Sequence, residues 1–210
     1  MISLSEILHT IAQALMIPCL IILLVLMAGA VWQIGDIVVE YIAERRKHKC
    51  NVPQLLRDVH AAGADGLADL IETSGLLRRQ KKALLELAES RGLPKDTLTA
   101  LAERLLATEE ARNARTTSIT DMIAKLGPMF GLLGTLIPLG PGIVALGQGD
   151  TVTLSESMNV AFDTTIAGVI SAAAASVISH IRKRWYNDDV VSLETLMEAV
   201  LEEVTSDVEG

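Results

Sequence analysis

Lysine and arginine are absent from most of this 210-residue chain, and this absence constrains the fold more than any other feature. All 18 of them fall within residues 45–125 and 182–184. Three long stretches carry almost no charge, the third containing one acid, Asp163; they are residues 7–35, 126–149 and 157–181. A helix rises about 1.5 Å per residue, so each stretch is long enough to cross about 30 Å of hydrocarbon. The sequence therefore predicts an integral membrane protein with three transmembrane helices.

The basic segments also predict the orientation of these spans. Short segments rich in Lys and Arg stay on the cytoplasmic side of a membrane. We therefore expect a multi-pass protein of the cell (inner) membrane, with its N-terminus outside and its C-terminus in the cytoplasm. The aromatic residues suit this orientation, because amphipathic rings favour the headgroup level, and four of them fall at the predicted inner ends of spans one and three: Trp32, Tyr41, Trp185 and Tyr186.

The polar parts of the chain are predicted to be helical as well, which makes the fold class all-α. Leucines recur at helical spacing through the large loop, which we expect to form a small helical bundle. Beyond the third span, apolar residues form a stripe on an acidic helix that needs a partner surface, either this bundle or another copy of the chain. The predicted organisation is residues 1–39 for the outside N-terminus and first span, 40–122 for the cytoplasmic helical domain, 123–181 for spans two and three with a short outside loop near 150, and 182–210 for the cytoplasmic tail.

Several function classes find no support in the sequence. The net charge is −8 and there is no basic stripe to neutralise phosphates, so nucleic acid is not an expected partner. No nucleotide-binding loop, Ser/His/Asp set or His–Cys cluster occurs at a usable spacing, so we expect neither an enzyme nor a metal or cofactor site. Cys19 lies inside span one and Cys50 in the loop, so no disulfide is expected.

Small residues recur on one face of both later spans. In span two, Gly127, Gly131 and Thr135 are four residues apart and Gly134 borders them; span three carries a second stripe formed by Ala161, Thr165, Gly168, Ala172, Ala175 and Ser179. Small side chains let helix backbones approach closely in a bilayer. The two stripes therefore predict close helix packing.

Asp163 is the one acid within the third span, and Thr164 and Thr165 follow it. A carboxylate at such depth costs at least about 2.5 kcal/mol, so it usually faces water or a partner. Asp163 is either part of a functional site or an acid near the outer interface that water reaches, since Glu156 lies only seven residues earlier.

Two motifs at the right spacing resemble one family. The run from Gly127 to Thr135, Gly-Pro-Met-Phe-Gly-Leu-Leu-Gly-Thr, is similar to the second-span signature of the MotA/TolQ/ExbB proton channel family. Residues 164–168, Thr-Thr-Ile-Ala-Gly, and the alanine-rich run after them resemble its third span. The order of spans and loops also resembles that of ExbB and TolQ.

This resemblance implies a homopentameric ring that surrounds a single-span partner of ExbD, TolR or MotB type. The partner would carry the titrating Asp, and Thr135 and Thr165 would face it. Val160 occupies the place where ExbB-like proteins often have a Glu, so the resemblance leaves open whether Asp163 or Glu156 takes part.

The leading hypothesis is a proton-channel subunit that couples the proton motive force to biopolymer or protein transport. A motility-type stator subunit is the alternative within this class, and H⁺ and Na⁺ both stay open as the transported ion. A membrane scaffold that conducts nothing is the alternative from another class, although such an anchor needs neither Asp163 nor paired stripes of small residues.

Overall fold

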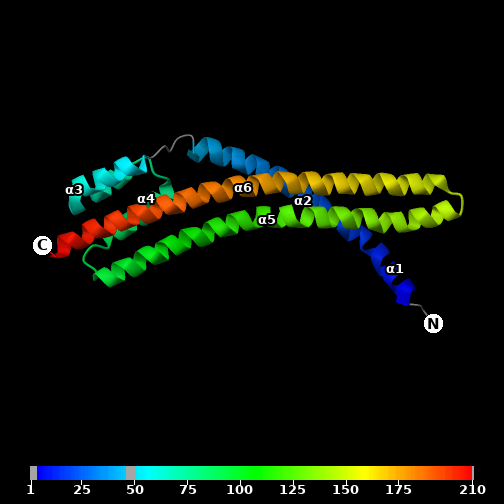
Figure 1. The fold of residues 1–210 in the computed structure, drawn as a ribbon, viewed down its shortest axis with the longest axis horizontal. Coiled ribbons are helices and arrows are strands. Elements are labelled where there is room, and N and C mark those ends of the chain that lie inside the picture. The colour runs from blue at the N-terminus through cyan, green and yellow to red at the C-terminus, as the bar shows by residue number, and fades with distance from the viewer. Residues whose placement is uncertain (1–3, 46–50, 210) are drawn as a thin grey trace. The chain divides into compact units, whose positions relative to one another are not determined.

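The computed structural model describes residues 4–45 and 51–209, and within them every regular element is a helix (Figure 1). The all-α prediction is confirmed. The elements in chain order are α1 (Leu4–Ala14), α2 (Met16–Glu40), the π-helical turn η1 (Tyr41–Arg45), α3 (Val52–Thr73), α4 (Arg78–Glu89), α5 (Lys95–Gly147) and α6 (Thr151–Glu209).

In the part of the chain that the structure describes, three helices are long and apolar enough to cross a membrane, which agrees with the predicted number. They are found in Glu6–Ala43, Lys95–Gly147 and Thr151–Thr205. Helix α5 contains 53 residues, because the polar helix that begins at Lys95 continues without interruption into the second apolar stretch. Helix α6 likewise continues from the third apolar stretch into the polar tail.

The chain divides into two compact units. The first, here called the span unit, consists of Met1–Asp36 and Thr117–Ile181. The second, here called the bundle unit, consists of Ile37–Thr116 and Arg182–Gly210. Helices α2, α5 and α6 each contribute one part to each unit.

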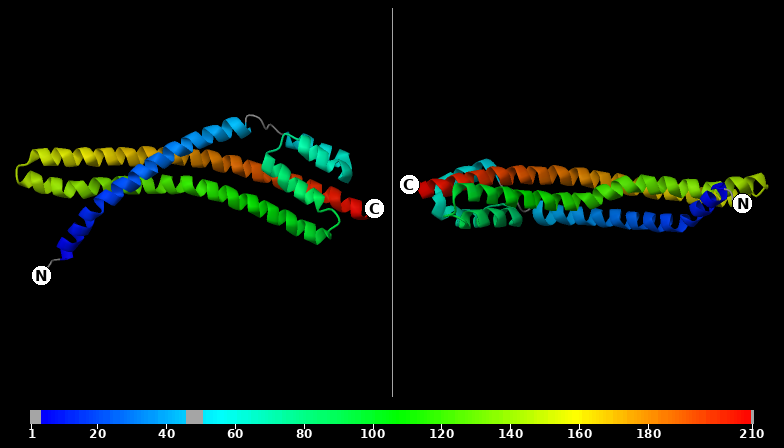
Figure 2. Two further views of the ribbon diagram at one scale, coloured as in Figure 1. Left: turned by 180° about the vertical axis from the view of Figure 1, so that it is seen from behind. Right: turned by 90° about the horizontal axis from the view of Figure 1, so that it is seen from below.

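The span unit is built on α5 and α6, which run side by side, with α2 crossing them (Figure 2). A small apolar cluster holds the three helices together, formed by Leu26, Ala30, Ile123 and Ala175. Nearer the start of α2, the buried Cys19 thiol donates to the Phe130 carbonyl oxygen at 3.4 Å. Cys19 is a free thiol, and Cys50 lies outside the described residues. Large apolar side chains elsewhere on these helices are exposed, Trp32 by 77 %, so this surface needs lipid or protein around it.

The bundle unit has its own apolar core, in which the end of α6 packs on α3, α4 and the start of α5. Its buried members include Val59, Leu67, Ile71, Leu84, Leu87, Leu98, Leu193, Leu196, Met197, Val200 and Val204. The predicted stripe on the C-terminal helix therefore covers the loop bundle within one chain. The loop residues of this unit are helical and share one apolar core with the end of α6.

Inside the bundle unit, an ion pair joins α2 to α6 and an aromatic pair joins η1 to α6. The Arg182 guanidinium is only 1 % exposed, and its Nε lies 3.1 Å from Glu40 Oε2. Next to it, the rings of Tyr41 and Trp185 stack with centroids 6.1 Å apart and planes 20° apart. Arg182 thus differs from Lys183 and Arg184, which are exposed.

Asp150 forms the cap of α6 in the short turn after α5. Gly149 allows this turn, because its φ of 84° lies in the left-handed region that favours glycine. The Asp150 carboxylate accepts the amides of Val152 and Thr153 at 3.1 and 3.0 Å, and the Thr153 hydroxyl at 2.6 Å. The cap satisfies amides that have no partner within the helix.

We expect the Asp150 carboxyl to titrate below 3.8, the ordinary pKa of this group, because the Thr153 hydroxyl and then its amide stabilise the charged form. A lowered pKa means that the cap is complete above the pKa of the unfolded chain and is lost as pH falls through the folded value. The amide proton shifts of Val152 and Thr153, followed by NMR, report this midpoint. Thr153→Val should move it up toward 3.8; a wild-type midpoint at or above 3.8 contradicts the cap.

Candidate functional site

The small residues of α5 and α6 face each other and bring the two backbones into contact. A Cβ atom added at Gly168 would lie 2.5 Å from the Gly127 carbonyl oxygen and 2.9 Å from Gly131 Cα. A Cβ atom added at Gly127 would lie 2.7 Å from the Gly168 carbonyl oxygen and 3.1 Å from Ala172 Cβ. Real Cβ atoms do not approach backbone this closely, so this seam between α5 and α6 requires glycine at both positions.

Thr164 belongs to the same seam. Its side chain is 4 % exposed, and a Cβ atom added at Gly134 would lie 2.6 Å from Thr164 Cβ. The Thr164 hydroxyl donates back to the carbonyl oxygens of Val160 and Ala161, each at 2.9 Å. The hydroxyl is therefore satisfied within its own helix, and the side chain fills the space that Gly134 leaves.

Thr135 and Thr165 come together in a groove on the surface of the span unit. The groove has a volume of about 440 Å³ and is lined by Thr135, Leu139, Met158, Ala161, Phe162, Thr165 and Ile166. The Thr135 hydroxyl donates to the Leu132 carbonyl oxygen at 2.7 Å, which leaves its oxygen able to accept a hydrogen bond. Two hydroxyl groups in an otherwise apolar groove suit an apolar helix that carries one polar group.

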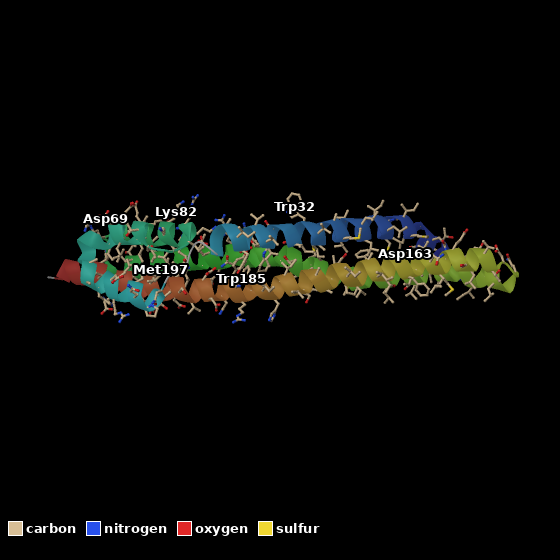
Figure 3. All side chains as sticks on the ribbon, turned by 90° about the horizontal axis from the view of Figure 1, so that it is seen from above. Trp32, Asp69, Lys82, Asp163, Trp185 and Met197 are labelled. Atoms are coloured by element: carbon tan, nitrogen blue, oxygen red, sulfur yellow. The ribbon has the colours of Figure 1, made fainter. Side chains whose placement is uncertain are left out.

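Asp163 does not line this groove, although it is two residues from Thr165. Successive residues of a helix are rotated by about 100°, so Asp163 points about 160° away from Thr165. The Asp163 side chain is exposed on α6 (Figure 3). A spacing of seven residues places Glu156 on the same face of this helix. The structure thus brings together two of the four candidate hydroxyl and acid residues, Thr135 and Thr165, and separates Thr164 and Asp163 from them.

Four apolar residues of the groove had not been singled out in the sequence, namely Leu139, Met158, Phe162 and Ile166, whereas Ala161 belongs to the predicted stripe of span three. Leu139 lies four residues after Thr135, while Ala161 and Phe162 lie four and three residues before Thr165. This spacing places them on the same helix faces as the two threonines. Positions three or four residues from each threonine could therefore have been predicted to line the groove. Their sequence does not distinguish them from other apolar positions in a span.

No cluster of three or more His, Cys, Asp or Glu side chains able to hold a metal ion occurs in residues 4–45 and 51–209. The acid in the groove's surroundings, Asp163, stands apart from its lining residues. The side chains that line the groove offer two hydroxyl groups, the Met158 thioether and hydrocarbon.

Comparison with known proteins identifies one family. The sequence profile of the MotA/TolQ/ExbB proton channel family matches residues 71–195. A search of curated protein sequences gives no significant match. The matched segment covers more than half of the chain and contains both sides of the groove and the whole seam. The chain therefore belongs to the MotA/TolQ/ExbB proton channel family.

Proposed function

We propose that the protein is the ring subunit of an ExbB- or TolQ-like complex that couples the proton motive force to transport of a protein or another biopolymer. In this proposal several copies, five by resemblance to the family, surround a single-span partner that carries a titrating Asp. The energy available is about 2.3 kcal/mol for each charge that crosses 100 mV. The subunit lies in the cell membrane with its N-terminus outside and its C-terminus in the cytoplasm.

The observation that carries the proposal is the meeting of Thr135 and Thr165 in one open, apolar groove. An acid on a partner helix needs hydrogen-bonding groups beside it when it is charged and apolar surroundings when it is neutral. The two hydroxyl groups supply the hydrogen bonds, and the five apolar side chains supply the apolar surroundings. A groove without a charged lining residue also leaves the acid itself to the partner.

Exposed apolar side chains support an assembly of several copies in a bilayer. On α5, Leu132 and Leu136 are each 60 % exposed, and on α6 Ile170 is 63 % exposed. Such surfaces are stable only against lipid or against another helix. In a ring, part of this surface contacts neighbouring copies and the rest contacts lipid.

Thr165→Val is expected to lower partner-dependent proton flux about tenfold, because it removes a hydroxyl that stabilises a charged acid while keeping the shape of the side chain. Flux is measured with a pH-sensitive dye in vesicles that contain the protein and a co-expressed single-span partner from the same genome. Asp163→Asn is expected to leave the flux unchanged, since Asp163 lies on another face of α6.

The two variants also separate the alternatives. Unchanged flux in Thr165→Val removes this residue from the path, and loss of flux in Asp163→Asn shows that an acid of the ring takes part. A wild-type protein that binds its partner but conducts in no condition is a scaffold instead of a channel. Exchange of Na⁺ for K⁺ outside the vesicles distinguishes H⁺ from Na⁺ as the ion.

A further inference from the structure

The hydroxyl group of Thr120, on α5 in the span unit, is fully buried and has no hydrogen-bond partner among the described residues. Other threonines of α5 and α6 donate back to a carbonyl oxygen of their own helix, among them Thr108, Thr116 and Thr164. Thr120 does not make this bond. An unpaired buried hydroxyl is unfavourable, so its presence in a folded protein needs an explanation.

The seam between α5 and α6 has a regular register. A Cβ atom added at Gly131 would lie 3.4 Å from the Thr164 carbonyl oxygen and 3.5 Å from Gly168 Cα. A Cβ atom added at Gly127 would lie close to Gly168 and Ala172 in the same way. A step of four residues back along α5 therefore corresponds to a step of four residues forward along α6.

This register places Thr120 beside Ser179. Thr120 lies seven residues before Gly127, which is two helical turns and the same face of α5. Its neighbours across the seam are therefore Ala175 and Ser179, which are both buried. The Ser179 hydroxyl donates to Asp121 Oδ1, which places Ser179 at the level of Thr120 along α5. The unpartnered hydroxyl thus lies within the seam, next to a second hydroxyl and a carboxylate.

The polar groups at this point of the seam suit a water molecule. A hydroxyl group has one hydrogen to donate and two lone pairs. Ser179 donates its hydrogen to Asp121, so its oxygen is able to accept a further hydrogen bond. The Asp121 carboxylate accepts several donors at once. A buried water typically makes about three hydrogen bonds, and Thr120, Ser179 and Asp121 supply three partners.

We propose that one water molecule binds in the seam between Thr120 and Ser179. It accepts a hydrogen bond from the Thr120 hydroxyl and donates to the Ser179 hydroxyl oxygen and the Asp121 carboxylate. Helices α5 and α6 are joined through water at this site, whereas Gly127 and Gly168 join them by direct backbone contact. None of the three residues lines the groove, so the proposal does not depend on proton conduction.

The direct test is a cryo-electron microscopy map of the full-length protein in lipid nanodiscs, at a resolution that shows ordered water. We expect density for one water within about 3.2 Å of the Thr120 and Ser179 hydroxyl oxygens. This density should be lost in the Thr120→Val variant. A wild-type map without density at this position overturns the proposal. Oxygen ligands at about 2.3–2.6 Å from the density would also overturn it, because they indicate a bound cation.

Thermal melting gives a second test, in which the sign of the change decides. Thr120→Val keeps the shape of the side chain and removes the hydroxyl. If water bridges the seam, this change breaks a hydrogen bond, and the melting temperature should fall by about 2–4 °C. If the hydroxyl has no partner, its removal should raise the melting temperature instead. An unchanged or raised melting temperature would therefore overturn the proposal.

A double-mutant cycle identifies the partner of Thr120. Combined with Ser179→Ala, Thr120→Val should lower the melting temperature by less than the sum of the two single changes, because either one breaks the bridge. Ser171→Ala is the matched control, since Ser171 is a buried serine of α6 whose hydroxyl donates to the Ala167 carbonyl oxygen. Its effect should add to that of Thr120→Val. Additivity with Ser179→Ala contradicts the bridge, and coupling without water density shows a direct hydrogen bond instead.

Discussion

Replacement of Gly168 by alanine is expected to destabilise the protein by about 3 kcal/mol, at the upper end of the range for overpacked cores. The added methyl group would lie 2.5 Å from the Gly127 carbonyl oxygen and 2.9 Å from Gly131 Cα. Both neighbours are backbone atoms, so no side chain can rotate away. Helices α5 and α6 must separate instead, and the groove between Thr135 and Thr165 widens with them.

Two other glycines of α5 serve as matched controls. A Cβ atom at Gly140 meets nothing within 4 Å, and one at Gly131 meets its nearest neighbour at 3.4 Å. Gly140→Ala should therefore be neutral or slightly stabilising, as alanine favours helix, and Gly131→Ala should have a small effect. Thermal melting and the size of the detergent-extracted particle check this order. If the Gly168→Ala and Gly140→Ala variants have the same melting temperature, the backbones of α5 and α6 are not in contact at this seam.

The second large effect is expected at the ion pair of α2 and α6. Glu40→Leu leaves the buried Arg182 guanidinium without its carboxylate, which we expect to cost about 3–5 kcal/mol. Arg182→Met leaves a partly exposed Glu40 that still accepts a hydrogen bond from the Tyr186 hydroxyl, so its cost should be smaller. The double variant Glu40→Leu/Arg182→Met should recover most of the stability, since an apolar pair of similar volume often equals a buried ion pair.

Chemical or thermal unfolding of the four proteins in one detergent gives the coupling energy of the pair. Arg184→Met is the matched control, because Arg184 belongs to the same basic triplet and is exposed. Its change should stay within about 0.5 kcal/mol. Additive effects of Glu40→Leu and Arg182→Met would show that the two charges do not interact.

Much of the span unit could be predicted because membrane-spanning helices contain few charged residues. The absence of Lys and Arg located the three apolar helices, and the four-residue spacing of Gly127, Gly131 and Thr135 indicated one face of α5. Periodicity alone did not say which partner each face meets. The adjacent residues Thr164 and Thr165 show this limit, since only the packed structure assigns the first to the seam and the second to the groove.

Contacts between distant parts of the chain were beyond the sequence. In the sequence, Arg182 is one of three consecutive basic residues that predict the cytoplasmic side of the third span. Nothing in that pattern indicates its partner Glu40, which lies 142 residues earlier. The sequence likewise gives no sign that α4 meets α6, because the contact of Gln80 with the Asp189 carbonyl oxygen spans 109 residues. Sequence periodicity shows which residues share a face of one helix. Which faces contact each other depends on how all the helices pack in three dimensions.

The lining of the groove has a consequence for the proposed coupling to an ion gradient. Its seven side chains include no group that gains or loses a proton near neutral pH. In the proposed complex, the group that alternates between charged and neutral would therefore belong to the partner helix. The groove would contribute its shape and the dipoles of two hydroxyl groups.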